Sequence, residues 1–165
     1  MSIPAKIKNY LTKNKLKFEI LKHKTVFTAY DLAQTTRTKL AEIGKTLFVK
    51  ADKDYYLVVL PAHRRLNIPK LKGLLKAKKI SIARENEMKT KLGIKPGAIT
   101  PFGSLYKISI VMDKSLAKAQ KALFGAGSFT ESLRFKLKDY IKFEKPITGD
   151  VGEASDLKLQ VKKKK

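Results

Sequence analysis

The chain has 165 residues, with 37 Lys and Arg against 14 Asp and Glu, a formal net charge of +23 and no cysteine. The lack of cysteine excludes disulfides, a cysteine nucleophile and thiolate metal sites, and no apolar stretch approaches the roughly 20 residues that span a bilayer. The charge favours a polyanionic partner, although a lysine-rich surface that is merely solvated accounts for it equally well.

Five of the basic residues are Arg and the rest are Lys. Lysine acts as a point charge that suits phosphates, whereas arginine more often reads base edges, so the composition predicts an RNA or DNA backbone binder. Residues 1–15 carry scattered charges and no continuous apolar region. We therefore expect no secretory signal, no membrane partner and a cytoplasmic location.

The first half of the chain predicts helices and strands in alternation. Pro4 can begin a helix with Ile7 and Leu11 on one face, and Thr28 can cap a second, short helix. The predicted elements are a helix from Pro4, a strand over 17–22, a helix over 29–33, and strands over 46–49 and 55–60 that are joined by a polar hairpin connection over 50–54.

Breaker residues divide the second half. Pro69 opens a basic amphipathic helix, and three Gly and two Pro between Gly93 and Gly103 predict a structured loop. The predicted elements are helices over 69–75, 85–92 and 139–141, and strands over 80–83, 107–112, 122–124 and 132–135, the last two around a glycine turn at 125–127. This alternation predicts one mixed α/β domain.

Beyond Pro146 the apolar pattern fades into Gly, Asp and Glu and ends in the run Lys162–Lys165. We therefore expect a folded domain over residues 1–145 and a basic, disordered tail over residues 146–165.

Three familiar kinds of site are not supported by the motifs. Gly44-Lys45-Thr46 imitates the end of a phosphate-binding loop, but Lys39 stands where that loop needs Gly, and a strand follows instead of a helix. His23 and His63 are 40 positions apart and have no zinc-ligand spacing, so no metal site is expected. A Ser-His-Asp triad is not excluded by counting, but no nucleophile-elbow pattern supports one.

Lys45 and the glycine-rich loop have two readings each. Lys45 follows a glycine at the mouth of a predicted buried strand, and is either a solvated strand-end lysine or a functional one. The loop that contains Gly97 and Pro101 either turns a corner or presents backbone N–H groups to a ligand.

In their order and spacing, these pieces resemble the YbaK/prolyl-tRNA-synthetase-associated domain family, which hydrolyses wrongly charged aminoacyl-tRNA. The similarity runs from about His23 to Ile141. Its marks are His23, Thr28-Ala29, Gly44-Lys45-Thr46-Leu47, Leu60-Pro61, Arg64-Arg65-Leu66, the loop from Gly97 to Pro101 with Phe102-Gly103, Asp113, and Gly125-Ala126-Gly127-Ser128.

The resemblance implies a barrel-like mixed β-sheet with peripheral helices and a pocket for the 3′ aminoacyl-adenosine. It also implies ester hydrolysis without metal, cofactor or covalent protein nucleophile, and Lys45 matches the family's essential lysine. The substrate-binding residues that it implies are Thr28, Ala29, Gly97, Ala98, Ile99, Pro101, Gly127 and Ser128. An amino-acid ester is already activated, so positioning and stabilisation of an oxyanion can suffice.

One position departs from the family pattern. Alanine-editing relatives often carry His after the Gly-Ser pair, where this chain has Phe129, which cannot hydrogen-bond or move a proton. The cysteine-clearing branch tends to have a more basic glycine loop than Ser128-Phe129. The amino acid that is cleared therefore stays open, as does the attacking group, water or a substrate thiol.

The resemblance implies a freestanding aminoacyl-tRNA deacylase that acts in trans, with aminoacyl-tRNA as its partner and an aminoacyl-tRNA synthetase as a further candidate. Such a domain must capture tRNA itself, and the excess of lysine fits this role, because each contact with a phosphate adds affinity regardless of sequence. The alternative is a non-catalytic tRNA-binding or synthetase-docking module on the same fold. A more distant alternative is a DNA-associated protein.

Overall fold

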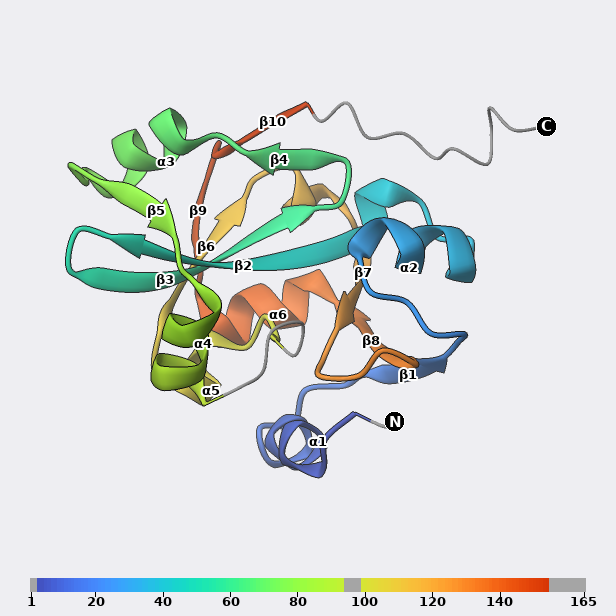
Figure 1. Ribbon diagram of the computed structural model, residues 1–165. Helices are drawn as coiled ribbons and strands as arrows, with labels where there is room; N and C mark the ends of the chain where they lie inside the picture. The colour runs from blue at the N-terminus through green and yellow to red at the C-terminus, as the bar shows by residue number, and fades with distance from the viewer. Residues whose placement is uncertain (1–2, 94–98, 155–165) are drawn as a thin grey trace.

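The structure is a computed structural model that describes residues 3–93 and 99–154 (Figure 1). The helices of this part are α1 (Ala5–Lys13), α2 (Ala29–Thr36), α3 (Ile68–Leu75), α4 (Glu85–Leu92), α5 (Gly103–Tyr106) and α6 (Leu137–Glu144), with short 3-10 turns at Leu40–Glu42 and Leu116–Lys118. The strands are β1 (Glu19–Lys22), β2 (Ile43–Ala51), β3 (Asp54–Pro61), β4 (Arg64–Leu66), β5 (Ile80–Ile82), β6 (Ser109–Asp113), β7 (Lys121–Gly125), β8 (Glu131–Lys136), β9 (Ile147–Gly149) and β10 (Gly152–Ala154).

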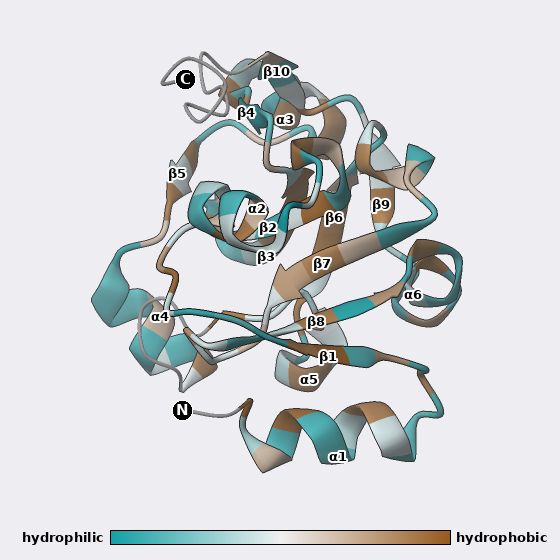
Figure 2. Ribbon diagram, turned by 90° about the vertical axis from the view of Figure 1, so that its right-hand side faces the viewer, coloured by the Kyte–Doolittle hydropathy of each residue, from teal (hydrophilic) through white to brown (hydrophobic). Residues whose placement is uncertain are grey.

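One large mixed sheet organises the molecule. Its strand order is β1-β8-β7-β2-β3-β6-β9, with β5 on β2, while β10 and β4 form a separate antiparallel pair. The β2–β7, β3–β6 and β6–β9 pairs are parallel and the other pairs are antiparallel. Figure 2 shows β7, β8 and β1 crossing at a steep angle to β6 and β9, so the sheet is strongly curved. The predicted mixed α/β fold with peripheral helices is confirmed.

The central hairpin has a tighter turn than the sequence suggests. The β2–β3 ladder runs from Gly44↔Pro61 to Ala51↔Asp54, so only two residues connect the strands. Asp52 adopts φ 55, the left-handed conformation that Asp tolerates better than most residues, and its carboxylate accepts hydrogen bonds from the Lys78 and Lys79 amides. The predicted hairpin is confirmed, but its connection is Asp52 and Lys53 rather than residues 50–54, because a polar residue at a strand end still pairs through its backbone.

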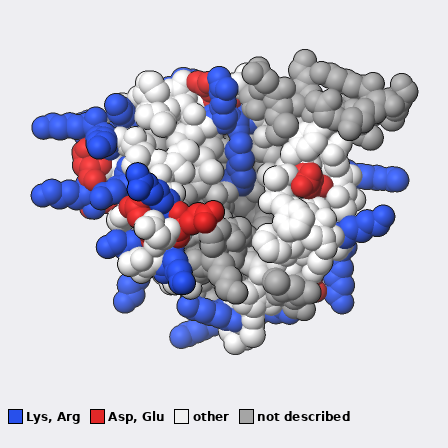
Figure 3. All heavy atoms as spheres, in the orientation of Figure 1, with Lys and Arg blue, Asp and Glu red and all other residues white. Residues whose placement is uncertain are grey.

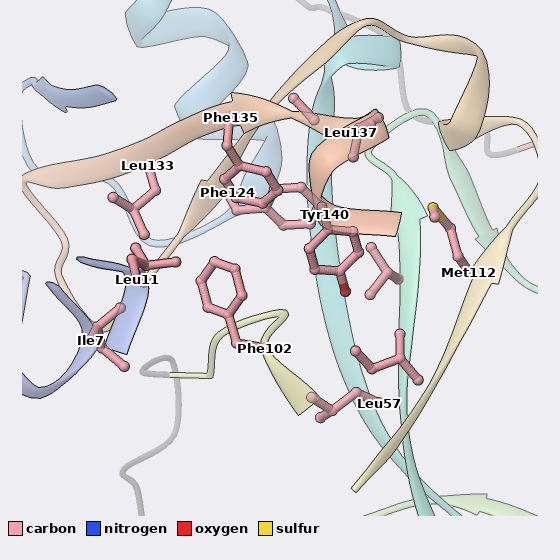
Figure 4. Close-up of a cluster of buried hydrophobic side chains, with 14 of the residues drawn as sticks. Ile7, Leu11, Leu57, Phe102, Met112, Phe124, Leu133, Phe135, Leu137 and Tyr140 are labelled. Atoms are coloured by element: carbon pink, nitrogen blue, oxygen red, sulfur yellow. The ribbon is translucent and has the colours of Figure 1, made fainter. Parts of the chain in front are cut away.

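An aromatic core fills the concave side of the sheet, where α1, α5 and α6 lie. Figure 4 shows Phe102, Phe124, Phe135 and Tyr140 gathered between β7, β8 and α6. The Phe124 and Phe135 rings stack with centroids 5.2 Å apart, and all four side chains are buried. Tyr140 donates its hydroxyl hydrogen to the carbonyl of Pro101 at 2.6 Å, so the core also fixes the chain that enters α5.

A partly buried carboxylate, that of Glu144, ties α1, α5 and α6 together. Tyr10 donates its hydroxyl hydrogen to Glu144 Oε2 at 3.0 Å, and the Ser104 amide donates to Glu144 Oε1 at 3.1 Å. Burial raises the pKa of Glu144 above its ordinary value, even though these hydrogen bonds favour the ionised form.

The other face of the sheet carries two smaller cores. Under α3, Leu71 packs with Val58, Leu60 and Val111. Under α2, Leu32 and Ala33 pack with Val26, Ile43 and Leu123 in a cluster that is separate from the other two. The helix α2 is thereby fixed over the start of β2.

The chain after Pro146 is part of the fold, which corrects the boundary expected at residue 145. β9 pairs in parallel with β6, and β10 pairs with β4. These strands are too short and too polar to stand out in the sequence, and long-range pairing holds them. The remainder of the expected tail, residues 155–165, lies outside the described residues.

Asp113, at the end of β6, anchors this C-terminal segment. It is fully buried, and its Oδ1 accepts the amides of Val151 and Gly152 at 2.9 Å each, while Arg64 Nε lies 3.4 Å from Oδ2. Burial alone would raise the pKa of Asp113, but the hydrogen bonds from Ser115 and Val151 and the charge of Arg64 hold it below its ordinary value.

The bounds of one predicted strand needed correction, and two short elements were not predicted. The strand expected over 107–112 begins at Ser109, because α5 occupies Gly103–Tyr106 and Lys107 ends it with φ 59. Neither α5 nor β4 was predicted, since each is four residues or fewer. Of the structured loop expected between Gly93 and Gly103, residues 94–98 lie outside the described part of the chain.

Candidate functional site

A hollow of about 180 Å³ opens between the start of α2, the start of β2 and the turn from β7 to β8. Its walls mix hydroxyl-bearing, apolar and aromatic side chains with a single charged one. The lining residues are Val26, Phe27, Thr28, Ala29, Leu32, Gly44, Lys45, Thr46, Ile99, Gly125, Ser128, Phe129 and Ser132.

The start of α2 forms one wall. Thr28 has extended backbone dihedrals and its Oγ1 accepts the amide of Asp31 at 3.0 Å, which is the capping arrangement expected from the sequence. Asp31 in the first turn also complements the positive end of the helix. The cap fixes the point at which the chain turns into the helix, and so fixes Thr28 and Ala29 at the hollow.

The turn between β7 and β8 forms the opposite wall. Gly127 has φ 82, a conformation that favours glycine. Ser128 is buried, and its Oγ accepts the amides of Thr130 at 3.1 Å and Glu131 at 3.0 Å. The Ser128 hydroxyl thus shapes the turn.

Hydrogen bonds from His23 also support the wall formed by the β7–β8 turn and the start of β8. The ring of His23 makes hydrogen bonds from Nδ1 to the Lys24 carbonyl and from Nε2 to Ser132 Oγ, both at 2.8 Å. His23 also donates its amide to the Thr130 carbonyl at 2.9 Å. His23 therefore positions Ser132 at the hollow without lining it.

Lys45 supplies the charge. It lies on β2 opposite Leu60, directly after Gly44, and its side chain is partly buried. Burial lowers the pKa of Lys45 below the ordinary lysine value. Within residues 3–93 and 99–154, no carboxylate forms an ion pair with it. A lysine in this setting presents a poorly solvated positive charge to whatever enters the hollow.

Gly44 lets the sheet close beneath Lys45. The Phe124 ring lies against the Gly44 Cα, and a Cβ at this position would fall 2.1 Å from the ring. β2 and β7 pair in parallel at this point, with Gly44 opposite Phe124. A glycine here is therefore needed for close approach.

His63, just beyond β3, experiences the same positive field. Its pKa is lowered by burial, by Arg64 and by Lys45, with Asp113 opposing. The imidazole is consequently held neutral over a wider pH range than usual. His63 does not line the hollow.

The structure brings together five of the sequence-predicted site residues: Lys45, Thr28, Ala29, Ile99 and Ser128. Gly127 directly precedes the lining residue Ser128, and Pro101 follows Ile99 by two positions, but neither lines the hollow itself. The Pro101 carbonyl accepts a hydrogen bond from Tyr140. Gly97 and Ala98 lie outside the described residues.

Sequence reasoning did not assign Phe27, Thr46 or Ser132 to the site. Phe27 reads as an ordinary core residue beside Val26, and no sequence signal distinguishes which of the two faces outward. Phe129 was singled out as a departure from the family pattern, and the structure places it in the wall.

The chemistry open to this hollow follows from its lining. Among the described lining residues, Lys45 is the one charged group, and none is His, Asp or Glu. The site is therefore suited to hold a small group that develops negative charge, through a cation and hydroxyls, rather than to remove protons with a carboxylate or imidazole.

No group of three or more His, Asp or Glu that could hold a metal ion occurs within the described residues. None of the helices in residues 3–93 and 99–154 is long and apolar enough to cross a membrane.

Comparison with known sequences identifies relatives for most of this fold. Residues 23–143 match the family model of the aminoacyl-tRNA editing domain. A proline–tRNA ligase of Macrococcus caseolyticus is 30% identical over 101 residues, which are 61% of this chain and 18% of the ligase. The prolyl-tRNA editing protein ProX of Acetoanaerobium sticklandii is 27% identical over 108 residues, 62% of this chain and 66% of that protein. The chain thus spans about two thirds or less of the length of these relatives.

Solved structures share the architecture. The crystal structure of a hypothetical protein superposes with a TM-score of 0.82 at 27% identity, covering 90% of this chain and 99% of that one. A candidate trans-editing enzyme for prolyl tRNA synthetase gives a TM-score of 0.76 at 19% identity, covering 91% of this chain and 96% of that one. The second likeness concerns the fold alone.

Proposed function

The chain belongs to the aminoacyl-tRNA editing domain family, and from this premise we propose that it is a deacylase that removes wrongly attached amino acids from tRNA in trans. The observation that carries the proposal is Lys45, a partly buried cation without an ion-pair partner in the described part of the chain, in a hollow sized for a small group.

The proposed step is attack of water on the carbonyl carbon of the aminoacyl ester. The carbonyl oxygen becomes an oxyanion beside Lys45, whose partly desolvated charge stabilises it more strongly than a solvated lysine would. The bond between the carbonyl carbon and the ribose oxygen then breaks, and the proton lost by the water ends on that oxygen. The products are a free amino acid and a tRNA with a free terminal hydroxyl.

Other groups of the site hold the substrate in this mechanism. Thr28 and Ser128 each accept a backbone amide from three residues further along the chain, and so fix the local shape of the wall to which each belongs. No lining side chain in the described part is a general base, so the proton is expected to move through water or through the neighbouring ribose hydroxyl of the substrate itself. Positioning and the lysine charge then supply most of the catalysis.

The substrate proposed is a tRNA carrying a small, wrong amino acid. The cavity of about 180 Å³ is below the range of about 300–1,000 Å³ typical of pockets for drug-sized ligands. The names of the ProX relative and of the trans-editing neighbour point to the prolyl-tRNA system. We therefore place the activity on tRNA for proline, in the cytoplasm where translation occurs, with the cognate synthetase as a candidate partner.

A panel of tRNAs, each charged with one labelled amino acid, incubated with the pure protein tests the proposal. We expect release of one or a few small amino acids, and loss of that release in Lys45→Met. Lys6→Met, which removes an exposed lysine on α1, is the matched control. Tight tRNA binding with no release from any member of the panel would reject the deacylase and leave a non-catalytic tRNA-binding module.

A further inference from the structure

Two aromatic rings form the rim of the hollow. The ring centroids of Phe27 and Phe129 lie 5.1 Å apart, with the planes tilted by 51°. The Val26 amide donates to the Phe129 carbonyl at 2.8 Å, which holds the two segments in register. The Thr28 cap then fixes the next residue, so this aromatic pair is held from both sides of Phe27.

The Phe27 side chain does not pack into the hydrophobic core. Its relative exposure is 71%, the highest of any large hydrophobic side chain in the described residues. An apolar residue just before a helix cap often packs on the first turns of the helix. Here the neighbour Val26 does so instead, in one buried cluster with Leu32. The Phe27 ring is thereby left with an open face at the mouth of the site.

The size of the hollow shows which part of a substrate must stay outside. A cavity of about 180 Å³ suits an aminoacyl group, whereas the nucleoside that carries the group is comparable to a drug-sized ligand and needs more room. With the ester at Lys45, the ribose and base are left at the rim. Phe27 and Phe129 both line that same hollow.

We propose that the Phe27–Phe129 pair is a stacking platform for the unpaired terminal base at the 3′ end of the tRNA. The inference rests on the proposed function, since it takes the aminoacyl end of a tRNA as the ligand. Open aromatic faces beside a positively charged surface are how proteins hold single-stranded nucleic acid without reading its sequence. Lys45 lines the same hollow, and Figure 3 shows further Lys and Arg side chains projecting from several sides of the molecule.

A protein partner fits this rim less well. Stable protein interfaces bury about 800 Å² on each side, far more than two phenylalanine rings present. A base, in contrast, needs one ring face. Phe129 backs Phe27 and keeps that face fixed, so the platform is formed before the ligand arrives.

A double-mutant cycle tests the platform. The probe is tRNA that carries alanine through an uncleavable amide on its terminal ribose, with the terminal base either present or removed. Binding is measured for the parental protein and for Phe27→Ala. Loss of one stacked base commonly weakens binding roughly 5- to 150-fold. We expect each single change to raise Kd within that range, and the two changes together to raise it no further.

Three further variants sharpen the result. Phe27→Tyr keeps a ring and should bind nearly as the parent does, while Phe27→Leu keeps apolar bulk without a ring face and should resemble Phe27→Ala. Ile82→Ala, which removes another exposed apolar side chain (55% exposed) outside the hollow, is the matched control and should not change Kd. Because Phe27 is exposed, none of its variants should alter the melting temperature by more than a few degrees.

Independent, multiplicative effects of the base and of Phe27 would overturn the platform, as would equal binding by Phe27→Ala and the parent. Because the probe cannot be cleaved, the cycle is separate from the deacylase assay. Ester release with an uncoupled cycle would reject the platform and keep the proposed function. A coupled cycle without ester release would keep the platform on a tRNA-binding module.

Discussion

Replacing Lys45 with Met should separate catalysis from stability. The substitution keeps the length of the side chain and removes a charge that is partly buried, with its pKa lowered by burial. Removing one preorganised group that stabilises an oxyanion commonly costs about 2–4 kcal/mol. At about 1.36 kcal/mol for each factor of ten, the rate on a saturating mischarged tRNA should fall roughly 30- to 900-fold.

The same change should leave the protein as stable as before, or more stable. A lysine whose pKa is lower in the folded state than its unfolded value of about 10.4 opposes folding while it is charged. This penalty is present in full below the folded pKa, and it disappears as the pH rises past the unfolded value. Lys45→Met removes the penalty at neutral pH, so the melting temperature at pH 7 should be equal or higher.

The assay follows release of labelled amino acid, corrected for spontaneous hydrolysis, beside a thermal melt of each variant. The enzymatic rate of the parent should also fall at alkaline pH, at a lower pH than an ordinary lysine would give. A folded Lys45→Met protein with the parental rate would refute the catalytic role. Lower activity together with a large drop in melting temperature would instead show that Lys45 is structural.

Four other changes give separate expectations. Gly44→Ala should lower stability by about 1–3 kcal/mol or more in a denaturant titration, because the new Cβ would overlap the Phe124 ring. Asp113→Ala should cost about 3–5 kcal/mol by the same measurement, since it leaves Arg64 without its buried partner, and the parent should lose this contribution as the pH falls through the lowered pKa of Asp113. Glu144→Gln should raise the melting temperature at pH 7 but not below pH 4, because a carboxyl whose pKa is raised on folding opposes folding only while ionised. Deleting Lys162–Lys165 should weaken tRNA binding and flatten its dependence on log salt, with the rate at saturating tRNA unchanged, as measured by a salt titration of both forms.

The elements that the sequence predicts well are those with local causes. Thr28 caps α2 because its own hydroxyl reaches the Asp31 amide, and the central strands stand out through their run of β-branched and aromatic residues. Both signals are contained in a few consecutive residues. The helices α1 and α3 were likewise marked by a proline at the start.

The elements that were missed depend on distant partners. β9 contributes only Ile147 as a large apolar residue, and β6 makes it a strand. The segment that follows it is held by the Asp113 carboxylate, nearly 40 positions away in the chain. No window of neighbouring residues contains that information.

The residues of the candidate site also divide into those that the sequence predicts and those that depend on distant contacts. Lys45 and Ser128 were found because the order of motifs resembles a known family, and the geometry then brings them to one hollow. The outward direction of Phe27 could not be foreseen. It follows from Val26 taking the buried place beside Leu32, which depends on how α2 lies on the sheet.

The anchoring of Asp113 also bears on how the chain folds during synthesis. Protein chains emerge from the ribosome N-terminus first, and β6 is complete nearly 40 residues before the Val151 and Gly152 amides that satisfy its terminal carboxylate. Until residues 147–152 emerge, β6 lacks its partner β9, and the Asp113 carboxylate lacks the amides of Val151 and Gly152. The contacts between Asp113 and these two amides are therefore among those that form last during synthesis, and a nascent chain that ends before β9 would leave the β6 edge of the sheet unpaired.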